Sequence, residues 1–291
     1  MHDLTPAPER LLIRKLEIDL KRGFGRHWHG GDVFRTQFFN ALSMSFPVGE
    51  QFFIDAVREA AKLLPDTAEG AALRETVSGF VGQEATHRHI HGLYNAHLEK
   101  QGLDNQWQHW AEARLARMRA RWPDMDKRHA LAATCAFEHL TALLADGTLR
   151  HDRWLEGAEP DMQVLWRWHA AEETEHRAVA FAVYRALGGD DRWRRRWYVY
   201  VCLTFLRDAT RQTLLNLRRD GTLWRLATWR EAASLFFGRD GLLWRTWRPA
   251  LAYFRRDFHP DRETAQPTAQ ALARDWLAAH AMRFRVVGGP R

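Results

Sequence analysis

The feature that most constrains the fold of this chain is a pair of Glu-x-x-His sequences, each preceded by a lone glutamate at nearly the same distance. The first pair is Glu84–His87, and it begins 34 residues after Glu50. The second is Glu173–His176, which begins 35 residues after Glu138. Helix positions three apart share a face, so each pair presents a carboxylate and an imidazole together. One such pair is common on solvated helices, whereas a matched repeat is informative.

Turn signals lie midway within each set. The midpoint of the first set is residue 67, inside the Pro- and Gly-containing stretch 65–70, and the midpoint of the second lies inside the break at 147–160. Residues equidistant from the turn of an antiparallel helical hairpin lie level with each other. We therefore predict two hairpins, each with its lone glutamate opposite its Glu-x-x-His pair, which pack so that four carboxylates and two imidazoles converge.

This convergence is the ligand set of a dinuclear carboxylate site in a four-helix bundle. Four buried carboxylates without counter-charge are strongly unfavourable, and two divalent ions would cancel their charge. Oxygen and imidazole donors suit iron or manganese, with cobalt or zinc as alternatives. The predicted metal ligands are Glu50, Glu84, His87, Glu138, Glu173 and His176.

Two further histidines fall on the ligand-bearing helix faces. His91 lies four residues after His87, and His169 lies four before Glu173. They are our candidate catalytic residues, as bases, extra metal ligands or partners of the ligands, although histidines hydrogen-bonded inside a bundle are the commoner case. Other polar residues nearby point off those faces, and we expect surface or interhelical contacts for His89, His139, Glu172 and Glu175.

Helical periodicity extends along the chain and strand signals are nearly absent, so the predicted fold class is all-α. The expected helices cover residues 33–63, 71–100, 104–120, 127–147, 160–187, 192–218, 222–237, 241–256 and 267–282. Pro47 and Gly49 interrupt the first of these, which predicts a kink or a helix that begins near Pro47.

We divide the chain into three parts. Residues 1–30 form an N-terminal arm, residues 31–189 a four-helix bundle with the dimetal site, and residues 190–291 a helical extension packed on the bundle. The segment 104–120 is then a helix that connects the two hairpins, as a long crossover requires.

The extension is unusually basic. Residues 192–256 contain 15 arginines against 4 acids, a balance of +11 in a chain whose net charge is +7, and they contain six tryptophans. This composition favours contact with an anionic surface, and a peripheral membrane contact through 192–256 is the form we expect. A general preference for Arg over Lys is the plainer explanation. No motif for nucleic acid stands out, so we expect no nucleic-acid partner.

Other features set the expected location. The longest apolar run, 199–206, is much shorter than the roughly 20 residues of a transmembrane helix, and the N-terminal residues lack an apolar signal region. The two cysteines, Cys135 and Cys202, are too few for a disulfide framework. We expect a cytoplasmic protein. The basic segment adds the alternative that it attaches to the inner face of the membrane.

The words around the predicted ligands resemble a known family. FPVGEQFF, QEATHRHIH, FEHLTA and AEETEH, together with FGRDGLLW and YFRRDFHP further on, are similar to the bacterial family named predicted metal-dependent hydrolases, within the ferritin-like di-iron carboxylate superfamily. The resemblance covers roughly residues 30–260. It implies a ferritin-like bundle with metal at the six ligands named above. The family's name implies hydrolysis, whereas the superfamily mostly implies oxygen activation or iron oxidation.

Three functions follow as alternatives. The first is an oxidase or oxygenase that activates O2 at a dimetal centre and acts on an apolar or lipid-like small molecule. The second is a metal-dependent hydrolase that uses water activated by two metal ions, with His91 or His169 as base. The third is a non-enzymatic metal-binding protein at the membrane surface. A homodimer contact through the extension is a further expectation.

Overall fold

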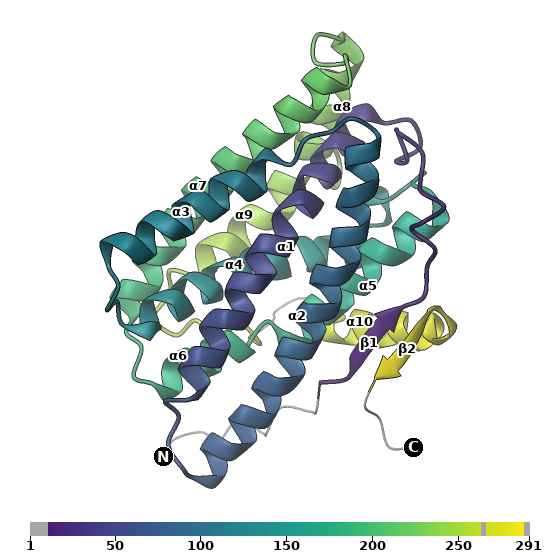
Figure 1. The fold of residues 1–291 in the computed structure, drawn as a ribbon. Coiled ribbons are helices and arrows are strands. Elements are labelled where there is room, and N and C mark those ends of the chain that lie inside the picture. The colour runs from purple at the N-terminus through teal and green to yellow at the C-terminus, as the bar shows by residue number, and fades with distance from the viewer. Residues whose placement is uncertain (1–10, 263–265, 288–291) are drawn as a thin grey trace.

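The computed structural model describes residues 11–262 and 266–287. Within those ranges the fold is helical apart from two short strands, so the all-α prediction is confirmed (Figure 1). The first ten residues of the expected arm lie outside the described residues. The elements in order are β1 (Ile13–Leu16), α1 (Val33–Ala61), α2 (Ala68–Lys100), α3 (Gln106–Arg121), α4 (Lys127–Arg150), η1 (Asp152–Trp154), α5 (Pro160–His176), α6 (Val179–Ala186), α7 (Asp191–Arg219), α8 (Leu226–Phe237), α9 (Leu242–Ala252), α10 (Ala269–Ala279), η2 (Ala281–Arg283) and β2 (Phe284–Val287).

Helices α1 and α2 form the first predicted hairpin and pack side by side (Figure 1). Helix α2 begins after Thr67, whose hydroxyl oxygen accepts a hydrogen bond from the Gly70 amide at 3.2 Å. A Cβ atom at Gly70 would lie 2.1 Å from the carbonyl oxygen of Pro65, so this tight turn requires glycine. The connection lies where the sequence placed the midpoint of the first ligand set.

Helix α1 continues through Pro47, so a helix that begins at this proline is a wrong expectation. Proline has no amide proton to donate to the carbonyl of Ser43, one turn earlier. The side-chain amide of Asn95 on α2 donates to that carbonyl instead, at 3.0 Å. A tertiary hydrogen bond therefore replaces the helical one that proline removes.

Helices α4 and α5 form the second hairpin, with η1 in the connection. Pro160 occupies the first turn of α5, where its missing amide proton costs nothing. We expected one helix over 160–187, but α5 ends at His176 and α6 begins at Val179. At the break, Arg177 is buried and its Nε lies 3.3 Å from Asp261 Oδ1, so a tertiary contact accompanies the interruption.

The two strands were not predicted. β1 and β2 pair antiparallel, with Ile13 opposite Val287 and Leu16 opposite Phe284. Each strand has only four residues, and its partner lies at the other end of the chain. A periodicity of two cannot be recognised over so short a segment. This pairing holds the N-terminal segment beside α2, which matters for the site described below.

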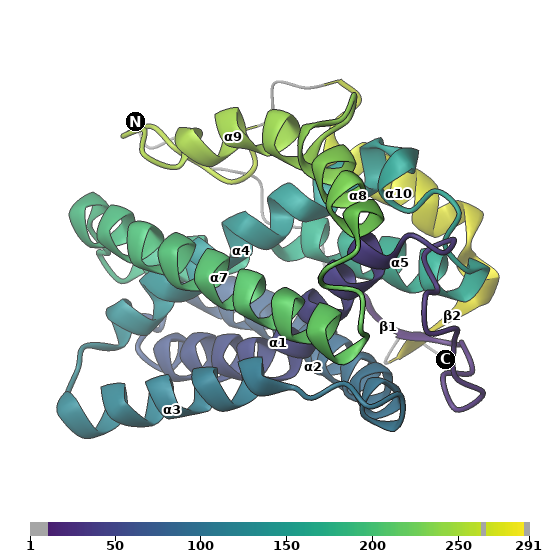
Figure 2. The same ribbon diagram turned by 90° about the horizontal axis from the view of Figure 1, so that it is seen from above.

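The later helices cover the hairpins. Helix α7 packs along α1 and α4, α8 on α1, α9 on α4, and α10 on α5 (Figure 2). Arg194 of α7 is fully buried, and its guanidinium donates to the carbonyl oxygens of Tyr253 and Arg255 just beyond α9. This contact joins α7 to the end of α9. The division of the chain into arm, bundle and extension stays a prediction.

None of the helices in the described ranges is long and apolar enough to span a lipid bilayer.

Candidate metal centre

All six predicted ligands lie in the interior, within one layer that crosses α1, α2, α4 and α5. None of them exposes more than 4% of its surface. Apolar side chains enclose this layer along each helix. On α2, for example, Phe80 and Val81 precede Glu84 in one apolar cluster, and Ile90 and Tyr94 follow it in another. The polar layer is therefore sealed from water at both ends by packed apolar residues.

Two groups of side chains each bring one potential ligand atom per residue within 4.8 Å of the others. The first group comprises Glu84, His87, Glu173 and His176. The second comprises Glu50, His87 and His169. Because His87 belongs to both groups, the two sets adjoin. Five of the six predicted ligands fall in these groups, and the sixth, Glu138, belongs to neither.

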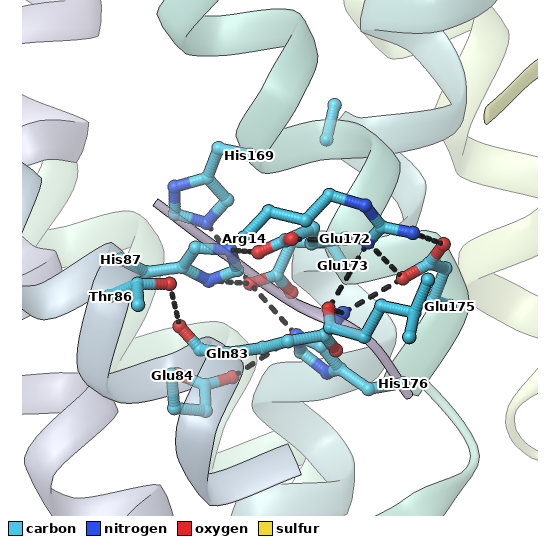
Figure 3. Close-up of polar contacts among 12 residues, drawn as sticks. Arg14, Gln83, Glu84, Thr86, His87, His169, Glu172, Glu173, Glu175 and His176 are labelled. Atoms are coloured by element: carbon cyan, nitrogen blue, oxygen red, sulfur yellow. Dashed lines mark hydrogen bonds and ion pairs between the residues drawn. The ribbon is translucent and has the colours of Figure 1, made fainter. Parts of the chain in front are cut away.

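His87 points into the layer with one ring nitrogen and away from it with the other (Figure 3). Its Nε2 lies 3.0 Å from Glu172 Oε2, a hydrogen bond between buried groups. Its Nδ1 lies 3.5 Å from Glu173 Oε1 and makes no hydrogen bond. The Glu172 bond fixes the ring so that Nδ1 faces the predicted metal position, as is typical of histidine ligands.

His176 has a similar arrangement on the other side of the layer. Its Nδ1 lies 3.1 Å from Glu138 Oε2, within hydrogen-bond distance. Its Nε2 lies 3.4 Å from Glu84 Oε1 and 3.8 Å from Glu173 Oε1, without a hydrogen bond to either. Glu138 thus contacts the cluster through His176.

Many polar atoms of this layer have no hydrogen-bond partner. They are both carboxylate oxygens of Glu50 and of Glu84, Oε1 of Glu138, Oε2 of Glu173, Nδ1 of His87 and Nε2 of His176. An unpaired buried polar atom costs about 1–3 kcal/mol, and more if it is charged. So many in one place indicate that a ligand of the opposite charge belongs between them.

The pKa values also show that burial disfavours the charged forms of these groups. Burial raises the pKa of Glu50 well above its usual range, and burial raises that of Glu138 to about 7. Burial and the neighbouring Glu173 raise the pKa of Glu84. Burial opposes the charged form of His87, but Glu172 and Glu173 outweigh it and raise the His87 pKa to about 10. In the absence of a cation, protons therefore balance the charge, and a bound cation would displace them.

Glu173 is the carboxylate that stays ionised. Burial alone would raise its pKa, but the charge of His176, the hydrogen bond from His169 and the nearby His87 ring lower it well below the usual range. Burial likewise opposes the charged form of His176, whereas Glu173 and Glu138 outweigh it and raise the His176 pKa. One carboxylate and two imidazoles thus provide the charged framework of the layer.

Sequence reasoning missed an outer set of residues around His87. Arg14 of β1 lies 3.1 Å from Glu172 Oε1 and 2.8 Å from Glu175 Oε2 (Figure 3). Gln83 donates to the same oxygen of Glu175 at 2.8 Å. The surface alternative for Glu172 is wrong, because this residue is fully buried. One weak signal was available, an arginine in the otherwise apolar stretch LLIR at the start of the described chain.

The two candidate catalytic histidines form a chain of hydrogen bonds that starts at Glu173. His169 Nε2 lies 3.0 Å from Glu173 Oε1, and its Nδ1 lies 2.7 Å from His91 Nε2. His91 Nδ1 lies 2.8 Å from Ser43 Oγ, which also contacts Asn95 Oδ1 at 2.8 Å. His169 therefore borders the predicted ligands, whereas His91 touches only His169 and Ser43 along this chain.

The proton positions in this series of hydrogen bonds follow from the ionised state of Glu173. A carboxylate only accepts hydrogen bonds, so His169 donates through Nε2 and accepts at Nδ1 from His91 Nε2. The single Ser43 hydroxyl proton then faces two acceptors at 2.8 Å, His91 Nδ1 and Asn95 Oδ1. Burial lowers the pKa of His169 to about 4 and that of His91 well below its usual range, so both rings are neutral.

Two apolar pockets reach the layer from different sides. The first extends from His169 and Glu173 of α5, between rings such as Phe39 and Trp166, to Leu242 at the start of α9. The second reaches Glu50 and is lined mostly by α1, α3, α4 and α7. Phe46 and Thr141 line both pockets and separate them. Apolar molecules could therefore approach the carboxylates without crossing bulk water.

A comparison with known proteins identifies the family. The model of a family described as predicted metal-dependent hydrolase matches residues 13–264 of the chain. This match includes β1, which carries Arg14, and every predicted ligand. Neither the curated proteins nor the solved structures include a match. The chain is therefore a member of the family of predicted metal-dependent hydrolases.

Proposed function

We propose that this protein is a hydrolase that depends on metal held by Glu50, Glu84, His87, Glu138, Glu173 and His176. The observation that carries the proposal is the set of buried carboxylate oxygens and imidazole nitrogens without hydrogen-bond partners that face one another in a single layer. The family description supports hydrolysis. The hydrolase alternative therefore replaces the O2-activating oxidase that we put first from the sequence.

The donor set fits a divalent transition metal. Carboxylate oxygens and imidazole nitrogens suit iron, manganese, cobalt or zinc, and no thiolate takes part, since Cys135 is absent from both ligand groups. We propose two ions because the two groups of ligand atoms adjoin, although His87 Nδ1 can bind only one of them, and because four carboxylates need a charge of about +4 for balance. Two adjacent hairpins with α3 in a long crossover support a ferritin-like four-helix topology.

The chain's own residues have distinct tasks in this proposal. A bound divalent cation supplies the acidity that activates water and polarises the bond to be cleaved. Glu172 holds the His87 ring through Nε2, and Arg14 holds Glu172. The neutral His169 ring donates through Nε2 to Glu173 and can receive a proton at Nδ1 from His91 Nε2, 2.7 Å away. The apolar walls of the two pockets keep bulk water from the layer.

Metal content and activity together test the proposal. Glu84→Ala and His176→Ala should each remove most of the metal from purified protein, whereas His139→Ala should retain it. His139 is the matched control because it follows Glu138 directly yet contacts the Pro249 carbonyl at 3.2 Å. Equal metal content in all three variants would contradict the ligand assignment. Hydrolysis of ester, amide or phosphoester probes should proceed anaerobically, and turnover that consumes O2 would contradict the reaction class.

A further inference from the structure

Helix α9 lies on the outside of the molecule and buries none of its residues (Figure 2). Its exposed apolar side chains are Leu243, Trp244, Trp247 and Leu251, which are 40–59% exposed. At about 100° per residue, these four positions span an arc of roughly 100°. The helix thus presents a continuous apolar stripe to solvent, with Arg248 at its edge and stacked on Trp247 at 5.1 Å.

Helix α8 presents a second stripe that is continuous with the first. Leu226, Trp229 and Phe237 are 43–66% exposed and share one side of α8. The Phe237 ring contacts the Trp244 ring, with centroids 6.2 Å apart, and the Trp244 indole donates to the Phe237 carbonyl at 3.2 Å. We call these seven residues the α8–α9 apolar face. Exposed apolar patches of this kind mark interaction sites.

Charge indicates what this face binds. Residues 222–256 contain seven arginines and only two acids, Glu231 and Asp240. A contact between two copies of the chain across a two-fold axis would bring arginines against arginines, which is unfavourable. A bilayer with anionic headgroups instead accepts tryptophan and arginine at the same depth.

The apolar face also adjoins the first pocket. Leu235 of α8 and Leu242 of α9 line that pocket, whose other end is formed by His169 and Glu173. Leu242 directly precedes the exposed Leu243, so the pocket extends from the predicted metal ligands to the edge of the apolar face. Its lining of Phe, Leu and Trp side chains suits a hydrocarbon chain.

We propose that the α8–α9 apolar face binds an anionic lipid bilayer and that the first pocket takes the acyl chain of a lipid substrate, with the reacting end of the lipid at Glu173. The inference rests on the proposed function in one respect, the position of the reacting end of the lipid at Glu173. Membrane binding and chain binding are properties of the folded protein and can be measured with or without metal.

Vesicle co-sedimentation of the full chain tests the membrane contact. Wild-type protein should bind vesicles of phosphatidylcholine with one quarter phosphatidylglycerol, and Trp244→Glu with Trp247→Glu should weaken this binding at least tenfold. The matched control is Trp122→Glu with Leu63→Glu, which adds the same charge at equally exposed apolar positions away from the face and should bind as wild type. Equal binding by both double variants, or no binding by metal-replete wild type, would overturn the proposal. A dimer that only the first double variant dissociates, with vesicle binding unchanged, would assign the face to self-association instead.

A fluorescent fatty acid, cis-parinaric acid, tests the pocket. Ala145 lines the first pocket and Ala133 lines the second, and both lie on α4. Ala145→Leu should raise the Kd for parinarate at least tenfold, whereas Ala133→Leu should not change it. If Ala145→Leu fails to fold, Leu242→Trp, at a half-buried position, fills the outer end of the same pocket. Unchanged binding in a folded first-pocket variant would overturn the assignment. Parinarate binding without metal would sustain the inference even if the hydrolase proposal failed.

Discussion

The buried carboxylate layer and the α8–α9 apolar face depart from ordinary protein structure in opposite ways. The layer encloses ionisable groups in the interior, and the face exposes tryptophan and leucine to water. Each arrangement is unfavourable for the protein alone. We propose a different partner for each, a cation for the layer and a lipid surface for the face. The first pocket connects the two.

The largest expected effect concerns the ion pair that supports the layer. Arg14→Met should lower the free energy of unfolding by about 3 kcal/mol, because it removes one of the two cations, Arg14 and His87, that the fully buried Glu172 contacts. It should also weaken metal binding by about tenfold or more, because Glu172 orients His87. Urea unfolding and metal titration measure the two effects.

Arg285→Met is the control for this change. Arg285 lies on the paired strand β2, its side chain is 70% exposed, and its Nε lies 3.7 Å from Glu17 Oε1. An exposed pair contributes about 0–1 kcal/mol, so this variant should be nearly as stable as wild type. Similar losses in both variants would mean that strand pairing, rather than the buried charge, accounts for the effect.

An intermediate effect is expected for a buried histidine outside the layer. Burial lowers the pKa of His29 to about 4, and its Nε2 donates to the Trp154 carbonyl at 2.8 Å. The unfolded chain binds this proton below about pH 6.5, so the stabilisation is complete above that pH and is lost as pH falls towards 4. Between pH 7 and 5.5 the loss is about 1 kcal/mol.

The variant His29→Gln isolates this contribution. The decrease in unfolding free energy between pH 7 and 5.5 should be about 1 kcal/mol smaller in His29→Gln than in wild type. His109→Gln, at an exposed histidine, should keep the wild-type decrease. If His29→Gln also keeps it, the acid sensitivity belongs to other groups, of which the carboxylate layer is the first to examine.

The smallest expected effect concerns the apolar face. Trp247→Ser and Leu251→Ser should each change the free energy of unfolding by no more than about 0.5 kcal/mol, because both side chains are already half exposed. Leu131→Ala, in the fully buried core, should cost about 2–5 kcal/mol by comparison. Thermal unfolding measures both. A large loss in the serine variants would mean that the face stabilises the fold, which would weaken the case for a lipid surface.

The sequence by itself predicted the helical hairpins and the six residues that meet in the layer. Spacing within a hairpin is a local property, since helix geometry and one turn at Pro65–Gly70 determine which residues lie level. The reaction was not predictable in this way, since the same ligand types serve oxidation and hydrolysis. The break after His176 and the passage of α1 through Pro47 are also accompanied by distant contacts, with Asp261 and Asn95, that the local sequence does not show.

Only the tertiary structure decided what surrounds the layer. Arg14 meets Glu172 across 158 residues of chain, and His91 meets His169 across 78. No periodicity encodes such pairs, because they depend on how separate elements pack. The same holds for the first pocket, whose lining comes from α1, α4, η1, α5, α8 and α9. Local geometry thus fixed which groups could converge, and packing fixed their partners and the pockets that lead to them.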